Sequence, residues 1–346
     1  MPPFELAGQS VKPGEMRKIH IPAVRLYTDT PIDLIINVIH GKKPGPVLLV
    51  CAAFHGDELN GIEICRRLRQ QKVLKKLAGT LLIVPVINML GFIQQSRYLP
   101  DRRDLNRCFP GSQHGSLGSR LAYLIQTELL SRATHAIDLH TGAVHRSNLP
   151  QIRADFDNAE AQQMAEAFGA PVIMDAKLLA GSFRECASNE NVPLIVYEAG
   201  EALRFDEPAI KAGMRGILAV MRTLTMLPRL KMQASKKLIE PVQVRKSYWV
   251  RAVCDGMVAR KIALGTRVKK GELLCVLATP FDNEHHEIRA KNDGIVIGAT
   301  QIPVVNEGEA LLHIAEFSQL RDAATSVSNF QDRFEVDETI GLDQLS

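Results

Sequence analysis

The sequence predicts an α/β fold followed by a small all-β domain, and three observations support this division. Between residues 32 and 227, short runs of β-branched residues alternate with longer segments whose apolar residues recur at three- and four-residue spacing. This alternation predicts a largely parallel sheet with helices on both faces. From residue 248 to 316 the segments are short, alternating and separated by glycine turns. The chain of 346 residues also exceeds the ~100–200 residues of one typical domain.

The elements expected in the first region are bounded by Gly, Pro or Asn. We expect strands at residues 34–39, 47–53, 80–87, 135–139, 172–175 and 194–197. We expect helices at residues 58–71, 117–130, 159–168, 182–189 and 208–226. Residues 88–115 fit neither period, and a long irregular loop inside a compact domain is usually functional.

The all-β region, residues 248–316, follows a charged linker at residues 228–247 and contains an internal repeat. DGMV and GELL, which begin at Asp255 and Gly271, recur as DGIV and GEAL later in the region, so we expect two similar β-units packed as a small sandwich. The region resembles the barrel-sandwich fold of biotinyl and lipoyl carrier domains. Those domains present a lysine on the hairpin between the units, whereas residues 278–289 contain none, so a carrier role is not expected. The polar, acidic tail at residues 317–346 has no assignment.

Composition is typical of a folded globular protein. Hydrophobic residues make up 46% of the chain and charged residues 23%, which excludes disordered and fibrous classes. The N-terminus shows no signal pattern and the apolar runs are too short to span a bilayer, so we expect a cytoplasmic protein without a membrane partner. Six cysteines without CxxC spacing predict reduced thiols. The net charge of +4 is modest and the basic residues form no stripe, so we expect no nucleic-acid partner.

Two segments place metal-binding residue types at strand ends. His55 and Glu58 lie in HGDE, directly after the strand expected at 47–53, and His140 ends the apolar run AIDLH. Each signal alone is weak, since HxxE occurs by chance and a strand-end histidine needs no ligand. Parallel strand ends, however, lie side by side at the carboxyl edge of a sheet. Two histidines, a glutamate and an open position for water form a catalytic zinc site, so we expect one Zn²⁺ per chain, with Asp138 among several candidates to support a ligand.

A third β-run ends in the carboxylate of Glu198, within YEAGE. Beside a zinc ion this group is the natural general base, because it can take a proton from water and return it to a leaving amine. An exposed strand-end charge is the alternative explanation. Glu201 competes for the role, and we favour Glu198 because it follows the apolar run directly.

An arginine cluster at residues 97–107 lies in the irregular loop. Arginine clusters are usually solvated. This loop, however, is expected to reach the same sheet edge, and guanidinium groups bind carboxylates through two parallel hydrogen bonds. A cationic pocket beside zinc predicts a small anionic substrate.

Taken together and in this order, HGDE, SRYLPDRRDLNRCFPG, DLHTG and YEAGE resemble the succinylglutamate desuccinylase and aspartoacylase family, whose catalytic domain is shared with the zinc carboxypeptidases. The resemblance covers about residues 47–226 in motif and continues through the β region in architecture. It implies a zinc carboxypeptidase-like mixed sheet flanked by helices in a catalytic domain at residues 1–227. It also implies hydrolysis of the amide bond of a small N-acyl amino acid.

The resemblance assigns roles to particular residues. The zinc ligands match His55, Glu58 and His140, and the catalytic glutamate matches Glu198. The groups that hold the carbonyl oxygen and the substrate carboxylate match Arg97, Asn106 and Arg107. A further substrate-gripping arginine precedes the catalytic glutamate in aspartoacylase, and Arg184 is the candidate here. Two features differ from better-known members of the family: this chain has HGDE where they have HGNE, and its loop from Arg97 to Asn106 is longer than in aspartoacylase. The resemblance therefore does not identify the substrate within the family.

Other functions remain open from the sequence. A zinc carboxypeptidase acting on small peptides would use the same metal and arginines, but it would need an open cleft. A non-catalytic binding protein would be expected to lack a ligand or Glu198, and this chain retains both. The β domain could cap the site, with the ionisable hairpin at 278–289 acting either as a lid or as a solvated turn. A homo-oligomer is a further possibility.

Overall fold

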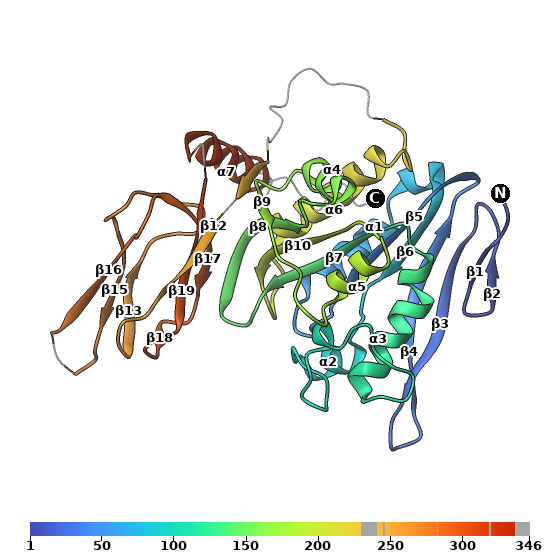
Figure 1. Cartoon of the computed structure of the whole chain (residues 1–346), viewed down its shortest axis with the longest axis horizontal. Coiled ribbons are helices and arrows are strands. Elements are labelled where there is room, and N and C mark those ends of the chain that lie inside the picture. The colour runs from blue at the N-terminus through green and yellow to red at the C-terminus, as the bar shows by residue number, and fades with distance from the viewer. Residues whose placement is uncertain (230–240, 245, 282, 318–319, 336–346) are drawn as a thin grey trace.

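The computed structural model describes residues 1–229, 241–244, 246–281, 283–317 and 320–335 (Figure 1). A large mixed sheet crosses the molecule, in the order β12-β19-β17-β8-β10-β7-β5-β6-β4-β3, and β9, β11 and β14 pair beside this path. The strands at its centre, β6, β5, β7 and β10, are parallel. The α/β class and the sheet flanked by helices are therefore confirmed.

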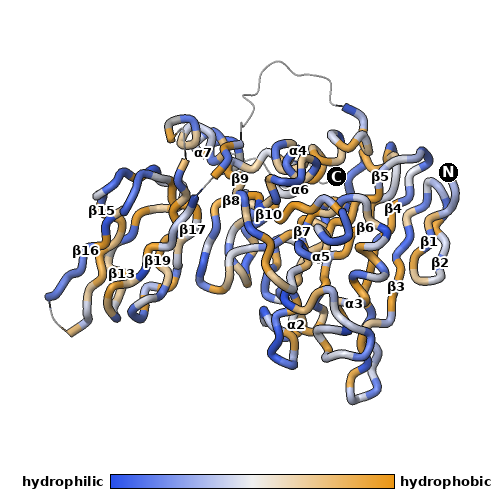
Figure 2. Tube along the Cα trace, viewed as in Figure 1, coloured by the Kyte–Doolittle hydropathy of each residue, from blue (hydrophilic) through white to orange (hydrophobic). Residues whose placement is uncertain are grey.

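The N-terminal strands are mostly apolar where they are buried, as expected for strands covered on both faces. They are β1 (Phe4–Leu6), β2 (Gln9–Val11), β3 (Met16–Arg25), β4 (Pro31–His40), β5 (Lys43–Ala52), β6 (Ala78–Val84), β7 (His135–Gly142), β8 (Arg146–Ala154), β9 (Val172–Asp175) and β10 (Leu194–Glu201). Figure 2 shows the hydrophobic colour running along the interior strands and hydrophilic segments at the periphery.

Helices cover both faces of this sheet. They are α1 (Asn60–Arg69), α2 (Met89–Gln94), α3 (Leu117–Glu128), α4 (Ala159–Phe168), α5 (Phe183–Asn189) and α6 (Glu207–Thr223), with 3₁₀ turns η1 (Lys72–Lys76), η2 (Leu105–Arg107) and η3 (Leu130–Arg132). One apolar core joins α1, α4 and α6 to the sheet. A second core packs α3 and α5 against the opposite face.

Each strand and helix expected in this region is present, β9 and α4 with the expected bounds and the others with shifted ends, but two long strands of the N-terminal part were missed. β3 has the sequence MRKIHIPAVR and β8 has the sequence RSNLPQIRA, and in each a proline and polar residues obscure the period of a strand. β8 pairs antiparallel with β10, which makes the sheet mixed where the alternation alone predicted a largely parallel one. The loop expected at 88–115 is only partly irregular, since it contains α2 and η2.

The C-terminal strands form a sandwich, as expected, but one of its sheets continues the main sheet. The strands are β11 (Val242–Val244), β12 (Lys246–Arg251), β13 (Gly256–Lys261), β14 (Arg267–Val268), β15 (Leu273–Ala278), β16 (His285–Arg289), β17 (Gly294–Thr300), β18 (Val304–Val305) and β19 (Ala310–Glu316). The sheet β16-β15-β13-β18 shares an apolar core with β12, β19 and β17. β17 also pairs with β8, from Gly298 opposite Asn148 to Thr300 opposite Arg146.

Two expectations fall partly outside the described residues. Of the linker at 228–247, residues 230–240 and 245 lie outside, and Val242–Val244 forms β11, which pairs with β9. Of the tail, residues 318–319 and 336–346 lie outside, while α7 (Leu320–Glu335) packs near β17. The boundaries of the domains stay a prediction. No helix in the described ranges is long and apolar enough to cross a membrane.

Candidate active site

The turn after β5 brings His55 and Glu58 to the carboxyl edge of the sheet. Gly56 is required there, because an added Cβ would lie 1.9 Å from the backbone carbon of Gly91. The Gly56 N–H donates to the Ser96 carbonyl at 3.0 Å, which ties the turn to the loop that follows α2. Both candidate ligands are buried as a result.

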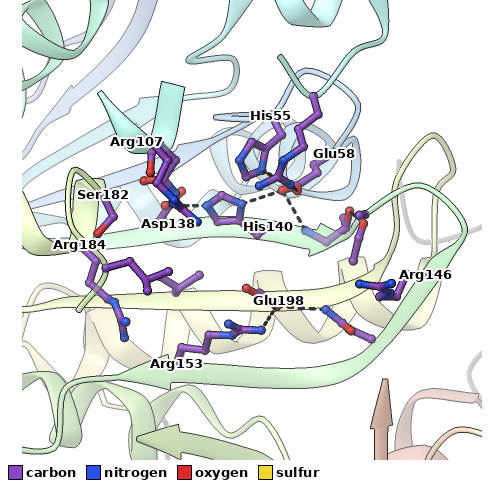
Figure 3. Close-up of a pocket in the computed structure, with 18 of the residues that line it drawn as sticks. His55, Glu58, Arg107, Asp138, His140, Arg146, Arg153, Ser182, Arg184 and Glu198 are labelled. Atoms are coloured by element: carbon purple, nitrogen blue, oxygen red, sulfur yellow. Dashed lines mark hydrogen bonds and ion pairs between the residues drawn. The ribbon is translucent and has the colours of Figure 1, made fainter. Parts of the chain in front are cut away.

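His140, near the end of β7, completes a compact group with these two residues. The carboxylate of Glu58 lies between the rings, with Oε1 2.7 Å from His55 Nδ1 and Oε2 2.7 Å from His140 Nδ1. The potential ligand atoms of His55, Glu58 and His140 all lie within 4.8 Å of one another. Figure 3 shows the three side chains converging from this turn and from β7.

Each imidazole is held through its second nitrogen by another carboxylate. His55 Nε2 lies 3.2 Å from Asp104 Oδ1, and His140 Nε2 lies 2.8 Å from Asp138 Oδ2. A carboxylate that accepts the Nε2 proton orients the ring and leaves Nδ1 as the basic atom, an arrangement found around metal-binding histidines. The donor set therefore fits a zinc ion held by two Nδ1 atoms and one carboxylate.

The charges of this group are strongly coupled. Burial alone would raise the pKa of Glu58, but His55 and His140 bring it well below its usual range. Burial opposes charge on His140, yet Asp138 and Glu58 raise its pKa. A concentration of buried carboxylates around two imidazoles favours a cation at this position.

Glu198 lies beside the metal-binding group because β10 and β7 are in register. Glu198 is the direct partner of His140 in these parallel strands, so the side chains share a face about 5 Å apart. Its Oε2 accepts hydrogen bonds from Arg153 Nη2 at 2.9 Å and Asn148 Nδ2 at 3.1 Å. In the part of the chain that the structure describes, Oε1 has no hydrogen-bond partner. One oxygen is thus held from β8 while the other is available to the cavity.

Glu201, the competing carboxylate, lies elsewhere. A register irregularity around Gly200 separates it from Glu198, and its Oε1 accepts the His145 N–H at 3.1 Å. Glu201 lines a second hollow with Arg204 and Asp206, away from the candidate metal ligands.

All residues expected from the sequence line a single cavity of about 240 Å³. They are His55, Glu58, Arg97, Asn106, Arg107, His140, Arg184 and Glu198. The cavity is bounded by the ends of β7 and β10, by β8, and by the loops around η2 and before α5 (Figure 3).

Arg97 and Asn106 are fixed in the irregular loop by different contacts. Arg97 Nη2 donates to Asp104 Oδ2 at 2.9 Å, and its Nη1 lies 3.6 Å from Glu58 Oε1. Asn106 Oδ1 accepts the Phe183 N–H at 2.8 Å, which anchors the loop to α5 and leaves the amide nitrogen as a donor to a ligand.

Two further arginines lie toward the α5 side of the cavity. Arg107 is exposed and donates to the Asn106 carbonyl. Arg184 donates to the Lys177 carbonyl through Nη2, while its buried Nη1 has no partner within the described residues. Burial and the neighbouring Arg153 lower the pKa of Arg184. A buried unpaired guanidinium N–H is costly, so an anionic ligand would satisfy it.

Sequence reasoning missed part of the cavity wall. Asn148 and Arg153 come from β8, which was not expected as a strand, and Trp249 comes from β12 in the C-terminal region. Asp104 was visible in the arginine-rich loop but had no assigned role. The hairpin β15–β16 lies at the far end of the molecule from the site, and none of its described residues line the cavity, so the alternative of a solvated turn agrees with its position (Figure 1).

Known proteins share sequence or fold with this chain. The N-alpha-acetyl-L-2,4-diaminobutyric acid deacetylase of Halomonas elongata is 27% identical over 292 residues, covering 80% of this chain and 83% of that protein. A succinylglutamate desuccinylase/aspartoacylase from Rhodobacter sphaeroides superimposes with a TM-score of 0.77 at 24% identity, covering 88% of this chain and 95% of that one. The product-bound ectoine utilization protein EutE (DoeB) from Ruegeria pomeroyi superimposes with a TM-score of 0.76 at 24% identity, covering 86% of this chain and 95% of that one.

Residues 44–224 match the succinylglutamate desuccinylase/aspartoacylase catalytic domain, which accounts for more than half of the sequence. The match contains every candidate site residue expected from the sequence. The chain therefore belongs to the succinylglutamate desuccinylase/aspartoacylase family.

Proposed function

We propose that this protein is a zinc-dependent hydrolase that cleaves the amide bond of small N-acyl amino acids. The observation that carries the proposal is the register of β7 and β10, which sets Glu198 beside His140 and the two other candidate ligands. The Halomonas elongata relative, a deacetylase of an N-acetylated amino acid by its name, supports the same reaction class.

The side chains divide the chemistry between them. A zinc ion at this site would supply a Lewis acid and lower the pKa of water toward neutrality. Glu198 takes the proton from the attacking water and returns it to the departing amine. Arg97, beside His55, stabilises the negative charge that develops on the carbonyl oxygen. Asn106 and Arg107 hold the carboxylate of the amino acid and so orient the amide.

The charge of the cavity supports an anionic substrate. Its lining contains the arginines Arg97, Arg107, Arg146, Arg153 and Arg184. Its carboxylates are Glu58, Asp138 and Glu198. Glu58 and Asp138 already contact histidines, and Glu198 already contacts Arg153. A divalent cation would increase the positive excess, so a carboxylate-bearing ligand is favoured.

The decisive experiment is an activity panel on zinc-loaded protein, with N-acetyl, N-succinyl and longer N-acyl amino acids beside short peptides. We expect hydrolysis of N-acyl amino acids and little release of amino acids from peptides. The reverse preference would identify a metallocarboxypeptidase, and no hydrolysis of any compound would overturn the proposal. We expect this activity in the cytoplasm.

Metal analysis tests the ligand set separately. We expect about one zinc per chain in the wild type and loss of most of it in His140→Ala. The matched control is His135→Ala, since His135 begins the same strand and contacts Glu160 instead. Full zinc content in His140→Ala would remove His140 from the ligand set.

A further inference from the structure

One wall of the cavity is built across the junction of two chain regions. Arg146 begins β8, Trp249 lies in β12, and both line the cavity that holds the candidate metal ligands. The guanidinium carbon of Arg146 lies 4.9 Å from the Trp249 ring centroid. Trp249 in turn stacks on His313 of β19, with centroids 4.2 Å apart and planes 10° apart, because the two residues are direct cross-strand partners. Trp249 therefore stacks with both the Arg146 cation and the His313 imidazole.

This stack leaves the Arg146 cation without a counter-ion. Among the described residues, its side chain makes no hydrogen bond or ion pair, although it is partly buried and Glu309 attracts it from a distance. His313 adds no competing charge near neutral pH, because burial, Arg153 and Arg146 lower its pKa to about 4. An indole face orients a guanidinium while leaving its N–H groups available for a planar anion.

The position of Arg146 indicates which part of the substrate would carry the anion that it binds. Figure 3 shows Arg146 on the opposite side of Glu198 from Arg107 and Arg184. If the amino-acid carboxylate is held at Asn106 and Arg107, an amide placed over Glu198 directs its acyl group toward Arg146. Trp249 lies beside that path and offers an apolar surface for methylene groups.

We propose that Arg146, supported by Trp249 and His313, forms a subsite for a carboxylate at the far end of the acyl group. The substrate class is then an N-carboxyacyl amino acid, with an apolar spacer against Trp249, rather than an N-acetyl amino acid. This proposal rests on the proposed function. It places acyl selection at the junction with the C-terminal strands.

A kinetic comparison tests the subsite. The N-succinyl and N-acetyl derivatives of the same amino acid are compared in wild type and in Arg146→Gln. We expect wild type to prefer the succinyl compound, and the ratio of the two kcat/KM values to fall about tenfold to a hundredfold in the variant, the usual effect of losing a charge-assisted hydrogen bond. An unchanged ratio, or a wild type that prefers the acetyl compound, would overturn the proposal.

The matched control is Arg251→Gln. Arg251 lies two residues after Trp249, acts on Arg146 through its charge, and donates to the Gly308 carbonyl at 2.7 Å without lining the cavity. We expect the succinyl-to-acetyl ratio to stay within about threefold, because this change removes charge but not the direct contact. An equal fall in both variants would show a general charge effect and overturn the subsite. Circular dichroism and zinc content confirm that both variants are folded and loaded.

A second measurement does not depend on turnover. Trp249 is the single tryptophan of the chain, so indole fluorescence, excited selectively over that of the tyrosines, reports on this wall. With succinate as the probe and acetate as the control, we expect a saturable change for succinate at lower concentration, lost in Arg146→Gln. An equal response to both acids, or one retained in the variant, would contradict the subsite. Failure of the proposed function is seen separately, as absence of hydrolysis of every N-acyl amino acid.

Discussion

At the scale of single residues, the two imidazoles owe their roles to carboxylates that contact them from outside the ligand set. Asp104 holds His55 and Asp138 holds His140, each through Nε2. Because Nε2 is engaged, Nδ1 is the nitrogen presented to Glu58 and to a cation. The residue types of the motif are thus necessary for a metal site, but their tautomers depend on partners from another loop and from β7.

Replacing Glu198 with glutamine should abolish nearly all turnover while preserving fold and zinc. An amide fills the same volume but cannot accept the proton, and general acid–base groups usually contribute about 10²–10⁴-fold to kcat. Steady-state rates and metal content measure both effects. Glu201→Gln is the matched control, since Glu201 lies on the same strand outside the cavity. A Glu198→Gln enzyme within threefold of wild type would transfer the role to another group.

Arg153 is expected to act as a positioning residue for Glu198. Arg153→Gln removes the 2.9 Å bond to Oε2 but leaves the Asn148 bond in place, so the carboxylate should lose orientation. We expect kcat to fall about 10- to 100-fold with KM within threefold, by analogy with the loss of a charge-assisted hydrogen bond. Arg153→Lys should recover part of kcat. A raised KM with unchanged kcat would place Arg153 in substrate binding instead.

At the scale of elements, the pairing of β12 with β19 creates a buried histidine whose ionisation opposes folding. The pKa of His313 is lowered from 6.5 to about 4, first by burial and then by Arg153 and Arg146. Below pH 6.5 the unfolded chain therefore binds the proton more readily than the folded chain does. The stability associated with neutral His313 is present above pH 6.5 and is lost as pH falls toward 4.

His313→Phe should make the protein less sensitive to acid. Phenylalanine can keep the stack on Trp249 but cannot take a proton. We expect the free energy of unfolding of wild type to fall more steeply than that of the variant between pH 6.5 and 4. The difference should reach about 3 kcal/mol, which corresponds to the lowering of the His313 pKa from 6.5 to about 4. Urea unfolding across this range measures the difference, because all other titrating groups are shared. Parallel curves for the two proteins would contradict the assignment.

At the scale of the whole molecule, the C-terminal strands complete the sheet that carries the site. β17 covers the edge of β8, β11 pairs with β9, and an apolar core joins Leu149 and Val172 to β17 and α7. The segment that holds Glu198 in place is therefore supported from both regions of the chain.

Removing the chain after residue 229 should prevent stable folding of the remainder. The cut exposes the edges of β8 and β9 together with their apolar core, and open edges of this kind promote aggregation. We expect the shortened chain to be insoluble or to lose cooperative unfolding, as judged by solubility and by thermal circular dichroism. A soluble fragment that unfolds cooperatively and binds zinc would show instead that the two regions fold independently.

Much of the fold and the candidate site could be inferred from the sequence, because both inferences use local patterns. Runs such as those of β7 and β10 reveal buried strands through their apolar residues, and His140 and Glu198 could be located because each follows such a run. HGDE was recognisable because His55 and Glu58 lie three residues apart, directly after the apolar run of β5. These features depend on residues near one another in the chain.

Tertiary structure alone decided which side chains surround the candidate metal ligands and Glu198. Pro150 and the polar residues of β8 conceal a strand that is stabilised by partners from distant segments, namely β10, β9 and β17. That pairing brings Arg153 to Glu198 and Arg146 to Trp249 across long stretches of sequence. Strand register and edge pairing are set by packing between distant segments, and so periodicity and motif spacing do not encode them.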